Sequence, residues 1–298
     1  MSSPPSLLAA TDFSTPARHA LERAAQLAAA HPDVQLTLAH VISISMLARL
    51  RGIMRDEAPA METRLADETA QALTEMATRL STQYACPVNT RLAQGSALDA
   101  ITDLADELQS NLLVMGARGA HFVREFLLGS TTERVLRRTR RPVLAVKQRP
   151  QGAYRRVLVP VDFSVHAVAA AQTAHRWLPD ADIILLHAFE VDIEGTLRFA
   201  SIDEEKIHAY RARAREDALE AMAQFVEQLS IPAGQLTRLV VHGAPTLRIL
   251  EHEQSLDVDL IAIGKHGQSV LEELLLGSVT KHVLAYSSSD VLVAGHPA

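Results

Sequence analysis

Residues 116–135 read GARGAHFVREFLLGSTTERV and follow a short apolar run at residues 112–115. The stretch places glycines at 116, 119 and 129, with Ser130 beside the last glycine and a helical pattern beyond it. A glycine-rich turn between a strand and a helix gathers main-chain N–H groups at a helix N-terminus, which suits a phosphate. The stretch therefore predicts a strand, a turn and a helix, with an anion site at the turn.

The same pattern occurs a second time in the chain. Residues 264–283 read GKHGQSVLEELLLGSVTKHV, and both copies fit the spacing G-x-x-G-x9-G-S. One such match is expected by chance in about one per cent of chains of this length. A single copy is also consistent with a plain loop and helix cap, but two copies at equivalent places indicate a duplicated unit.

The two halves of the chain align along their whole length, as expected of a tandem repeat. Residues 7–14 match residues 157–164, and each segment predicts a short apolar strand that ends in a carboxylate, followed by a serine able to cap a helix. Further strands are predicted at residues 34–41, 88–93, 112–115 and 143–146, and at residues 182–188, 236–242, 260–263 and 291–294.

Helical patterns separate these strands. Irregular segments are expected after the second strands, followed by long amphipathic helices whose stripes we assign to the core: Leu65, Thr69, Ala72, Leu73, Met76 and Leu80 in the first half, and Ile207, Tyr210, Ala214, Met222, Phe225 and Leu229 in the second. Ser96, with Asp99 three residues on, and Pro245 mark the next helix starts. The last helices are predicted at residues 131–140 and 279–286.

Alternating strands and helices predict an α/β fold, with a doubly wound, five-stranded parallel sheet in each half. The predicted domains are residues 1–147 and 155–298, joined by a linker at 148–154. In such sheets the ligand lies beyond the carboxyl ends of the strands, where the winding reverses. If the first and fourth strands are neighbours there, Asp12 faces Gly116 and Asp162 faces Gly264. Either carboxylate is also able to act only as a helix cap.

Composition and charge narrow the classes of function. The chain has 298 residues, 48% of them hydrophobic, and a net charge of −6. Residues 1–150 hold 17 Lys and Arg against 15 Asp and Glu, and residues 151–298 hold 12 against 20. This balance argues against a nucleic-acid surface. No charged leader precedes an apolar core and no apolar run approaches 18 residues, so we expect a cytoplasmic protein without a membrane partner.

Several catalytic and metal-binding patterns are missing from the sequence. None of the 13 histidines lies at a metal-ligand spacing such as H-E-x-x-H, so we expect no metal site formed by protein alone. The Walker pattern and the G-x-S-x-G elbow do not occur, and lone Cys86 has no evident base. His40 and His187 are interpreted as core or crevice-wall residues. The five arginines on the first half's last helix predict a solvated face: Arg134, Arg137, Arg138, Arg140 and Arg141.

These motifs together resemble the universal stress protein family, here as a tandem pair. The resemblance is carried by Asp-Phe-Ser after the first strand, the glycine motif, and the terminal strand Pro-Val-Leu-Ala-Val. It implies Rossmann-like sheets of order 3-2-1-4-5 and, for the branch that keeps the glycine motif, binding of ATP. The implied nucleotide-binding residues are Ala10, Thr11, Asp12, Val41, Met115, Gly116, Arg118, Gly119, Gly129, Ser130 and Thr131, and in the second half Pro160, Val161, Asp162, Ala188, Ile263, Gly264, His266, Gly267, Gly277, Ser278 and Val279.

The resemblance also implies a role for each group. Asp12 or Asp162 approaches the ribose or a phosphate-bound Mg²⁺, and the main chain at Val41 or Ala188 binds adenine. The first two glycines of each motif let the chain pass close to ribose and phosphates. The third glycine and the two residues after it donate to the phosphates. ATP, or AMP or ADP, is therefore the expected cofactor.

The two predicted sites differ at two positions. Arg118 in the first half corresponds to His266, and Thr131 corresponds to Val279. Charge-assisted contacts to phosphate are about twice as strong as neutral ones, so we expect the first site to bind ATP more tightly. A valine at Gly129 or Gly277 is expected to fill the space of the phosphate and, if φ is positive there, to strain the backbone.

Three functions remain open at the sequence level. The first is a stress-response regulatory module in which ATP orders residues 120–128 and changes the surface shown to unidentified protein partners. The second is a slow ATPase or a nucleotidyl or phosphoryl transferase. The third is a nucleotide-free scaffold or a binder of lipid or another small molecule. In the family, chains pair through the last strand; here we expect the two halves to do so within one chain, and a further homodimer is left open.

Overall fold

The computed structural model describes residues 5–119, 128–190, 204–267 and 276–295. The chain divides into two compact units, residues 1–153 and 154–298. The boundary lies inside the segment 148–154 that the sequence analysis assigned as a linker. The predicted association of the two halves through their last strands stays a prediction.

The first unit is built on five parallel strands: β1 (Ser6–Thr11), β2 (Gln35–Ser43), β3 (Val88–Gly95), β4 (Leu112–Gly116) and β5 (Val143–Val146). Their spatial order is β3-β2-β1-β4-β5, which confirms the predicted order 3-2-1-4-5. Every residue of β1, β4 and β5 is buried. Strands covered on both faces in this way appear in sequence as continuous apolar runs, which made them predictable.

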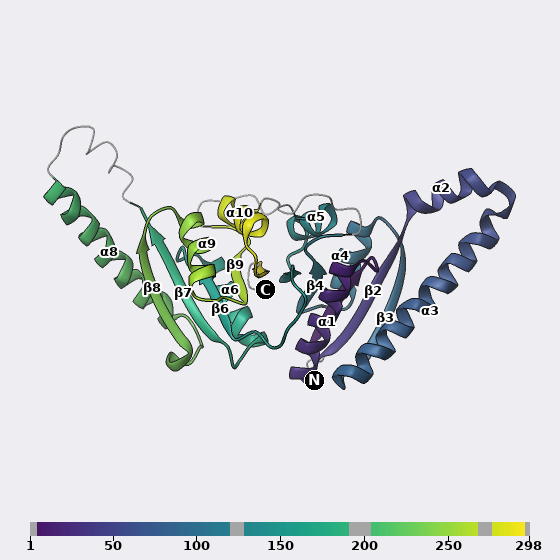
Figure 1. Ribbon diagram of the computed structural model, residues 1–298, viewed down its shortest axis with the longest axis horizontal. Helices are drawn as coiled ribbons and strands as arrows, with labels where there is room; N and C mark the ends of the chain where they lie inside the picture. The colour runs from purple at the N-terminus through teal and green to yellow at the C-terminus, as the bar shows by residue number, and fades with distance from the viewer. Residues whose placement is uncertain (1–4, 120–127, 191–203, 268–275, 296–298) are drawn as a thin grey trace. The chain divides into compact units, whose positions relative to one another are not determined.

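Four helices cover this sheet: α1 (Thr15–Ala30), α3 (Ala58–Tyr84), α4 (Ala97–Glu107) and α5 (Ser130–Arg138) (Figure 1). The crossovers through α1 and α3 run from β1 outward to β3, whereas those through α4 and α5 run from β3 across to β5. Because parallel crossovers are right-handed, the two directions put the two helix pairs on opposite faces. The chain therefore reverses its winding between β1 and β4.

The second unit repeats this arrangement. Its strands are β6 (Arg156–Pro160), β7 (Asp182–Phe189), β8 (Leu236–His242), β9 (Leu260–Gly264) and β10 (Asp290–Ala294), in the order β8-β7-β6-β9-β10. Its helices are α6 (Val165–Trp177), α8 (Glu204–Glu227), α9 (Pro245–Ser255) and α10 (Ser278–Tyr286), with a short 3-10 turn η2 (Ala233–Gln235) before β8. The reversal falls between β6 and β9.

The segment after β2 is helical, where an irregular segment was predicted. It forms α2 (Ile44–Met54) and the 3-10 turn η1 (Arg55–Glu57). The hydroxyl of Ser43 accepts from the N–H of Met46, which caps the new helix. The side chains of Arg51 and Glu62 then join α2 to the first turns of α3. The helix therefore forms although its sequence has little helical periodicity, with a capped start and a side-chain contact to α3.

The two amphipathic stripes are only partly buried. Leu73 and Leu80 of α3 and Phe225 of α8 lie in the core, as predicted. Tyr210, however, is 51% exposed and Ala72 is exposed, so their assignment to the core was wrong. The periodicity identified the helices correctly. It shows which face of a helix is apolar, but not how much of that face the neighbouring sheet covers.

The helix starts mostly follow the sequence signals. Ser14 accepts from the N–H of Ala17 at 3.3 Å and Ser164 accepts from Ala167 at 3.2 Å, which confirms both predicted caps. Ser96 is the N-cap residue of α4, but its side chain makes no capping hydrogen bond. The expected capping box is therefore wrong. Asp99 instead lies 3.3 Å from Arg138 of α5.

The arginines of α5 lie on a solvated face, as predicted, but the helix ends at Arg138, so Arg140 and Arg141 follow it. Arg137 pairs with Glu133 on the same helix, and Arg141 lies 3.2 Å from Asp106 of α4. These pairs are well exposed to solvent, so each contributes little to stability.

Candidate nucleotide site in each unit

A cavity of about 460 Å³ lies in the first unit where β1, β2 and β4 end and α5 begins. Eleven predicted residues of the first half line it: Ala10, Thr11, Asp12, Val41, Met115, Gly116, Arg118, Gly119, Gly129, Ser130 and Thr131. They come from four segments far apart in sequence, and the reversal of winding between β1 and β4 brings them together.

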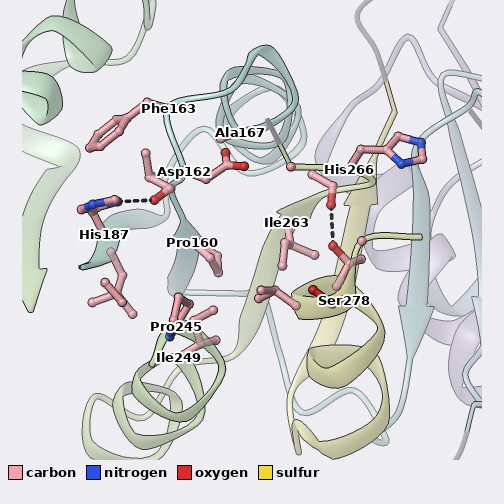
Figure 2. A pocket seen from close by; sticks show the side chains of 18 residues that line it. Pro160, Asp162, Phe163, Ala167, His187, Pro245, Ile249, Ile263, His266 and Ser278 are labelled. Carbon is pink, nitrogen blue, oxygen red and sulfur yellow. Dashed lines mark hydrogen bonds between the residues drawn. The ribbon is translucent and has the colours of Figure 1, made fainter. Parts of the chain in front are cut away.

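The second unit has a cavity of about 620 Å³ at the equivalent place (Figure 2). It is lined by all eleven predicted residues of the second half: Pro160, Val161, Asp162, Ala188, Ile263, Gly264, His266, Gly267, Gly277, Ser278 and Val279. Both volumes fall in the range of small-molecule sites. The binding of a nucleotide by these residues stays a prediction.

Other residues line the cavities without having been predicted. They are Ala17, Ala39, Ala97, Ile101, Leu128, Thr132 and Glu133 in the first unit, and Phe163, Ala167, Leu186, Pro245, Ile249 and Thr280 in the second. His40 and His187 lie in the cavity walls, which is one of the two positions that the sequence analysis gave them. Comparison of the two repeats could have identified some of the unpredicted residues. Ala17 matches Ala167 and Thr132 matches Thr280, although these positions lie outside the glycine motif.

Two hydrogen bonds close each glycine turn. In the first unit Gly129 donates its N–H to Ala117 O at 2.7 Å, and the Thr132 hydroxyl donates to Gly116 O at 2.8 Å. The N–H of Gly129 is therefore used inside the protein, and the expectation that it donates to a phosphate is wrong. The contact arises because the start of α5 folds back onto the end of β4.

The second turn is closed in the same way. Gly277 donates to Lys265 O at 3.0 Å, and the Thr280 hydroxyl donates to Gly264 O at 2.8 Å. The expectation for the N–H of Gly277 is wrong for the same reason. Both hydrogen bonds occur in both units, so the closed turn is part of the repeated fold.

Each turn leaves a helix N-terminus facing the cavity. The N-cap residues of α5 and α10 are Gly129 and Gly277, which have no side chain to cap the first helical turn. The first N–H groups of a helix have no acceptor within the helix, and the helix dipole favours negative charge there. Residues 130–132 and 278–280 therefore present main-chain donors suited to an anion.

The first glycine of each motif serves packing. A Cβ at Gly116 would lie 3.0 Å from Pro16 C, and one at Gly264 would lie 2.7 Å from His166 Cβ. These distances are too short for an added carbon atom. Gly116 and Gly264 thus allow the ends of β4 and β9 to approach the first turns of α1 and α6.

The second glycine of each motif faces the acidic side chain. A Cβ at Gly119 would lie 3.0 Å from Asp12 Oδ2, and one at Gly267 would lie 2.9 Å from Asp162 Oδ2. The sequence predicted that Asp12 would face Gly116, but the Cβ direction of Gly116 meets α1. The facing glycine is Gly119, three residues on, because the chain turns across the sheet end after β4.

Each aspartate takes part in the turn into the following helix, and its ligand role stays a prediction. Asp12 Oδ1 accepts from Ser14 N at 3.0 Å. Asp162 Oδ1 accepts from Ser164 N at 3.1 Å and from the Ser164 hydroxyl at 2.6 Å. One carboxylate oxygen therefore holds the turn into the helix, and the other lies beside the glycine turn at the cavity.

The edge of β7 is open to the second cavity. Val161 donates its N–H to Leu186 O at 2.8 Å, so the main-chain groups of Leu186 point toward β6. Main-chain groups alternate in direction along a strand, so those of Ala188 point the same way. Because β6 ends at Pro160, the groups of Ala188 face the cavity beyond it.

The first unit has the same open edge at β2. The last pair between β1 and β2 is Thr11 with His40, whereas β2 stays paired with β3 as far as Ser43 with Gly95. Val41, which corresponds to Ala188, therefore follows the point at which β1 has ended.

A proline shortens one ladder of the second unit. Strands β1 and β4 pair through Ala10 with Met115, but β6 and β9 pair only through Leu158 with Ile261. Pro160, at the position of Ala10, has no N–H to donate to a neighbouring strand. The larger of the two cavities lies beyond this shorter ladder.

The charged groups around the cavities differ between the units. Arg118 is exposed, whereas His266 is 8% exposed, and its ring lies 5.4 Å from that of His166. In Figure 2 the His266 ring points away from Asp162. Glu133, paired with Arg137 at 2.5 Å, lines only the first of the two cavities.

Within the described ranges, no group of three or more His, Cys, Asp or Glu side chains gathers as a metal site. Each cavity offers one predicted carboxylate, Asp12 or Asp162. Mg²⁺ is commonly held by one or two carboxylates together with the phosphates of a nucleotide, and either aspartate fits that mode. No helix among the described residues is long and apolar enough to cross a bilayer.

Cys86 lies outside both cavities. It is 4% exposed, and its Sγ lies 3.8 Å from Ala25 O. Burial raises the pKa of the Cys86 thiol, which keeps it protonated and poorly nucleophilic. The cysteine therefore has a packing role.

The repeated fold and its paired cavities define a tandem α/β protein with a small-molecule crevice in each half. The chain belongs to the universal stress protein family, whose model matches residues 5–147 and again residues 153–295.

Named relatives agree with this assignment. Universal stress protein MJ0577 of Methanocaldococcus jannaschii is 30% identical over 152 residues, which cover 47% of this chain and 94% of that protein. A universal stress protein of Mycolicibacterium smegmatis is 26% identical over 294 residues, 96% of either chain. The tandem form is therefore shared with a relative of full length.

A solved structure of full length shows the same fold. A universal stress protein from Archaeoglobus fulgidus superimposes with a TM-score of 0.67 at 21% identity and covers 98% of both chains. A universal stress protein solved in complex with cAMP is 28% identical and covers 50% of this chain and 100% of its own, with a TM-score of 0.35. An adenine nucleotide is thus a ligand of that protein.

Proposed function

We propose that this universal stress protein binds an adenine nucleotide, ATP or else AMP or ADP, in the cavity of one or both units. One repeated observation carries the proposal. In each unit an uncapped helix N-terminus and the aspartate that follows the first strand, Asp12 or Asp162, line a cavity of nucleotide size. Main-chain donors at a helix start suit phosphates, and a carboxylate suits ribose hydroxyls or a phosphate-bound Mg²⁺.

The open strand edge supports adenine as the base. A main-chain N–H and C=O on one edge of β7, at Ala188, offer one donor and one acceptor to the cavity. On the N7 side adenine presents a ring acceptor and an amino donor, whereas guanine presents two acceptors, N7 and O6. A main-chain N–H and C=O therefore match adenine on this side and leave the main-chain carbonyl facing guanine O6. We expect ATP to bind about tenfold more tightly than GTP.

The proposed role is that of a nucleotide-dependent regulatory module in the cytoplasm. A nucleotide changes the surface shown to partners only if it binds two conformational states with different affinity. The segment expected to respond, residues 120–128, lies outside the described residues except for Leu128. Hydrogen exchange with and without ATP measures this response, and equal protection along the chain would remove the regulatory part of the proposal.

Mass spectrometry of freshly purified, denatured protein tests the proposal directly. We expect a co-purified adenine nucleotide, and the protein stripped of it should bind ATP again in equilibrium dialysis. GTP serves as the matched competitor. A folded protein that carries no nucleotide and binds neither ATP, ADP nor AMP at millimolar concentration would contradict the proposal.

A further inference from the structure

The turn after the first strand of each unit has a backbone that its residue type disfavours. Phe13 and Phe163 both have φ of 63°, in the left-handed region. A bulky residue other than glycine is uncommon there, and such a conformation persists only where its surroundings hold it. In each unit the strained phenylalanine directly follows the aspartate that lines the cavity.

One histidine in each unit contacts the chain on both sides of that aspartate. His40 Nδ1 lies 2.7 Å from Thr11 O, and its ring lies 4.5 Å from the Phe13 ring at an interplanar angle of 37°. The carbonyl oxygen only accepts, so Nδ1 carries the proton and donates. The histidine thus contacts the residue before Asp12 and the residue after it.

The second unit repeats this arrangement with different neighbours. His187 Nδ1 lies 2.7 Å from Val161 O, and its ring lies 4.3 Å from Phe163 at 34°. Thr11 is replaced by Val161, yet the bond length, the stacking distance and the φ value are retained. If the histidine only filled space in the core, the hydrogen bond, the ring contact and the φ of the phenylalanine would not need to recur together in both units.

These contacts fix the direction of the aspartate. A peptide unit is planar, so anchoring the carbonyl of Val161 also sets the N–H and the Cα of Asp162. The ring also lies against Phe163, the residue that follows, but the hydrogen bond is the contact that holds the turn. With the turn held, Asp162 Oδ1 stays on Ser164 and Oδ2 stays beside Gly267.

The histidine does not reach the middle of the cavity. In Figure 2 the ring of His187 lies on the side of Asp162 that is away from Ile263 and Ser278. Because His187 also lines the cavity wall, the experiments below separate an effect through the aspartate turn from a direct contact with the ligand.

We propose that His40 and His187 are positioning residues that hold the ligand-facing carboxylates of Asp12 and Asp162 through the strained Phe13 and Phe163 turns. This inference rests on the proposed nucleotide site. It assigns a function to two side chains that the sequence left as core or wall residues.

Two matched double variants of the full chain test the inference. His40→Phe with His187→Phe keeps an aromatic ring but removes the N–H. His40→Asn with His187→Asn keeps a side-chain N–H near the place of Nδ1 but removes the ring. We expect the Phe pair to raise the Kd for ATP about tenfold, and the Asn pair to bind within about threefold of the original protein. Unchanged binding by the Phe pair, or equal losses in both pairs, would overturn the inference.

A cycle with the aspartate identifies the route of the effect. Asp12→Asn with Asp162→Asn should weaken ATP binding alone, and adding the Phe pair should weaken it little further, because both changes act through the same carboxylates. Fully additive losses would show that the histidines act elsewhere.

A ligand-free measurement separates this inference from the proposed function. NMR couplings and Cα shifts report the φ of Phe13 and Phe163 without nucleotide. We expect both residues to leave the left-handed region in the Phe pair and to keep it in the Asn pair. Retained φ values in the Phe pair would overturn the positioning role. Failure of the original protein to bind any nucleotide would instead remove the proposed function, leaving the φ measurement to decide whether the histidines hold the turns.

Discussion

At the scale of single residues, the glycines of the motif divide into two kinds. Gly116 and Gly264 make room for a helix, since an added Cβ would overlap with α1 or α6. Gly129 and Gly277 have φ of −62° and −56°, which any residue adopts. The sequence allowed for a positive φ and hence for backbone strain at the latter pair, and that condition is not met. Their role is to leave the helix start uncovered.

Substitutions should separate these two kinds of glycine. Gly129→Val and Gly277→Val should weaken ATP binding, because they place a side chain at the helix start that faces the cavity. They should cost less stability than changes at Gly116 or Gly264, because the nearest atom to an added Cβ is Ala117 O at 3.3 Å or Thr280 Oγ1 at 3.5 Å. Gly116→Ala and Gly264→Ala should instead destabilise the fold by about 1–3 kcal/mol through overpacking. Urea denaturation and ATP titration measure the two effects; the reverse pattern would contradict the assignment.

The threonines that anchor the helix start should matter for stability. Thr132→Val and Thr280→Val keep the shape of the side chain but remove the donor to Gly116 O or Gly264 O, and leave that buried carbonyl short of a partner. We expect a loss of about 1–2 kcal/mol in the free energy of unfolding for each. Thr131→Val is the matched control, since the second unit has Val279 there. If Thr131→Val lowers the free energy of unfolding as much as Thr132→Val does, the proposed anchoring role of Thr132 is wrong.

At the scale of elements, the strands were the most predictable part of the fold. Continuous apolar runs located β4 and β9, alternation with helical patterns indicated doubly wound parallel sheets, and the family resemblance supplied the strand order. Helix α2 was missed because the contacts that accompany it are not part of its local pattern: the Ser43 cap, the burial of Leu47, and the bond from Arg51 to Glu62, eleven residues away. Such contacts depend on how α2 and α3 meet, and the local pattern does not contain that information.

The link between α2 and α3 should respond to acid. The hydrogen bond from Arg51 lowers the pKa of Glu62 from its ordinary value of 4.5. A lowered carboxyl pKa stabilises the folded form above the unfolded value, and the effect is lost as pH falls through the folded value. Amide exchange in residues 44–54 should therefore rise below about pH 4.5 relative to the rest of the unit.

The variant Glu62→Gln provides the control for this link. It removes the charge at every pH, so its exchange in residues 44–54 should be raised already at neutral pH and should change less with acid. Identical pH profiles for the variant and the original protein would contradict a role for this pair.

The candidate site was predictable only in part. The motif spacing and the family resemblance located all eleven lining residues that were named in each unit. Thr132, His40 and the pairing of Asp12 with Gly119 act through contacts across 16 or more positions, such as the 2.8 Å bond from Thr132 to Gly116. Such partners become visible only when the strand ends are placed in space.

At the scale of the whole molecule, duplication provides two sites with different surroundings. The first has Arg118 and Thr131, where the second has a buried His266 and Val279. A fixed cation and an added hydroxyl favour phosphate, and the paired Arg137 offsets the charge of Glu133. We therefore expect the first site to bind ATP about tenfold more tightly.

Single-site variants measure this ranking. Gly129→Val should leave the weaker second site, and Gly277→Val should leave the tighter first site. Exchanging Arg118→His and His266→Arg in one chain should narrow the difference. Equal affinities in the two valine variants would remove the ranking but leave the nucleotide proposal intact.

Calorimetric titration of ATP into nucleotide-free protein and into the double variant Gly129→Val with Gly277→Val tests the central claim, that uncapped helix starts facing Asp12 and Asp162 hold the phosphates. The account predicts binding to the original protein, and loss of most of that affinity in a double variant whose unfolding midpoint is nearly unchanged. A double variant that binds ATP as tightly as the original protein would contradict the account, as would a folded original protein that gives no binding heat and retains no nucleotide in dialysis.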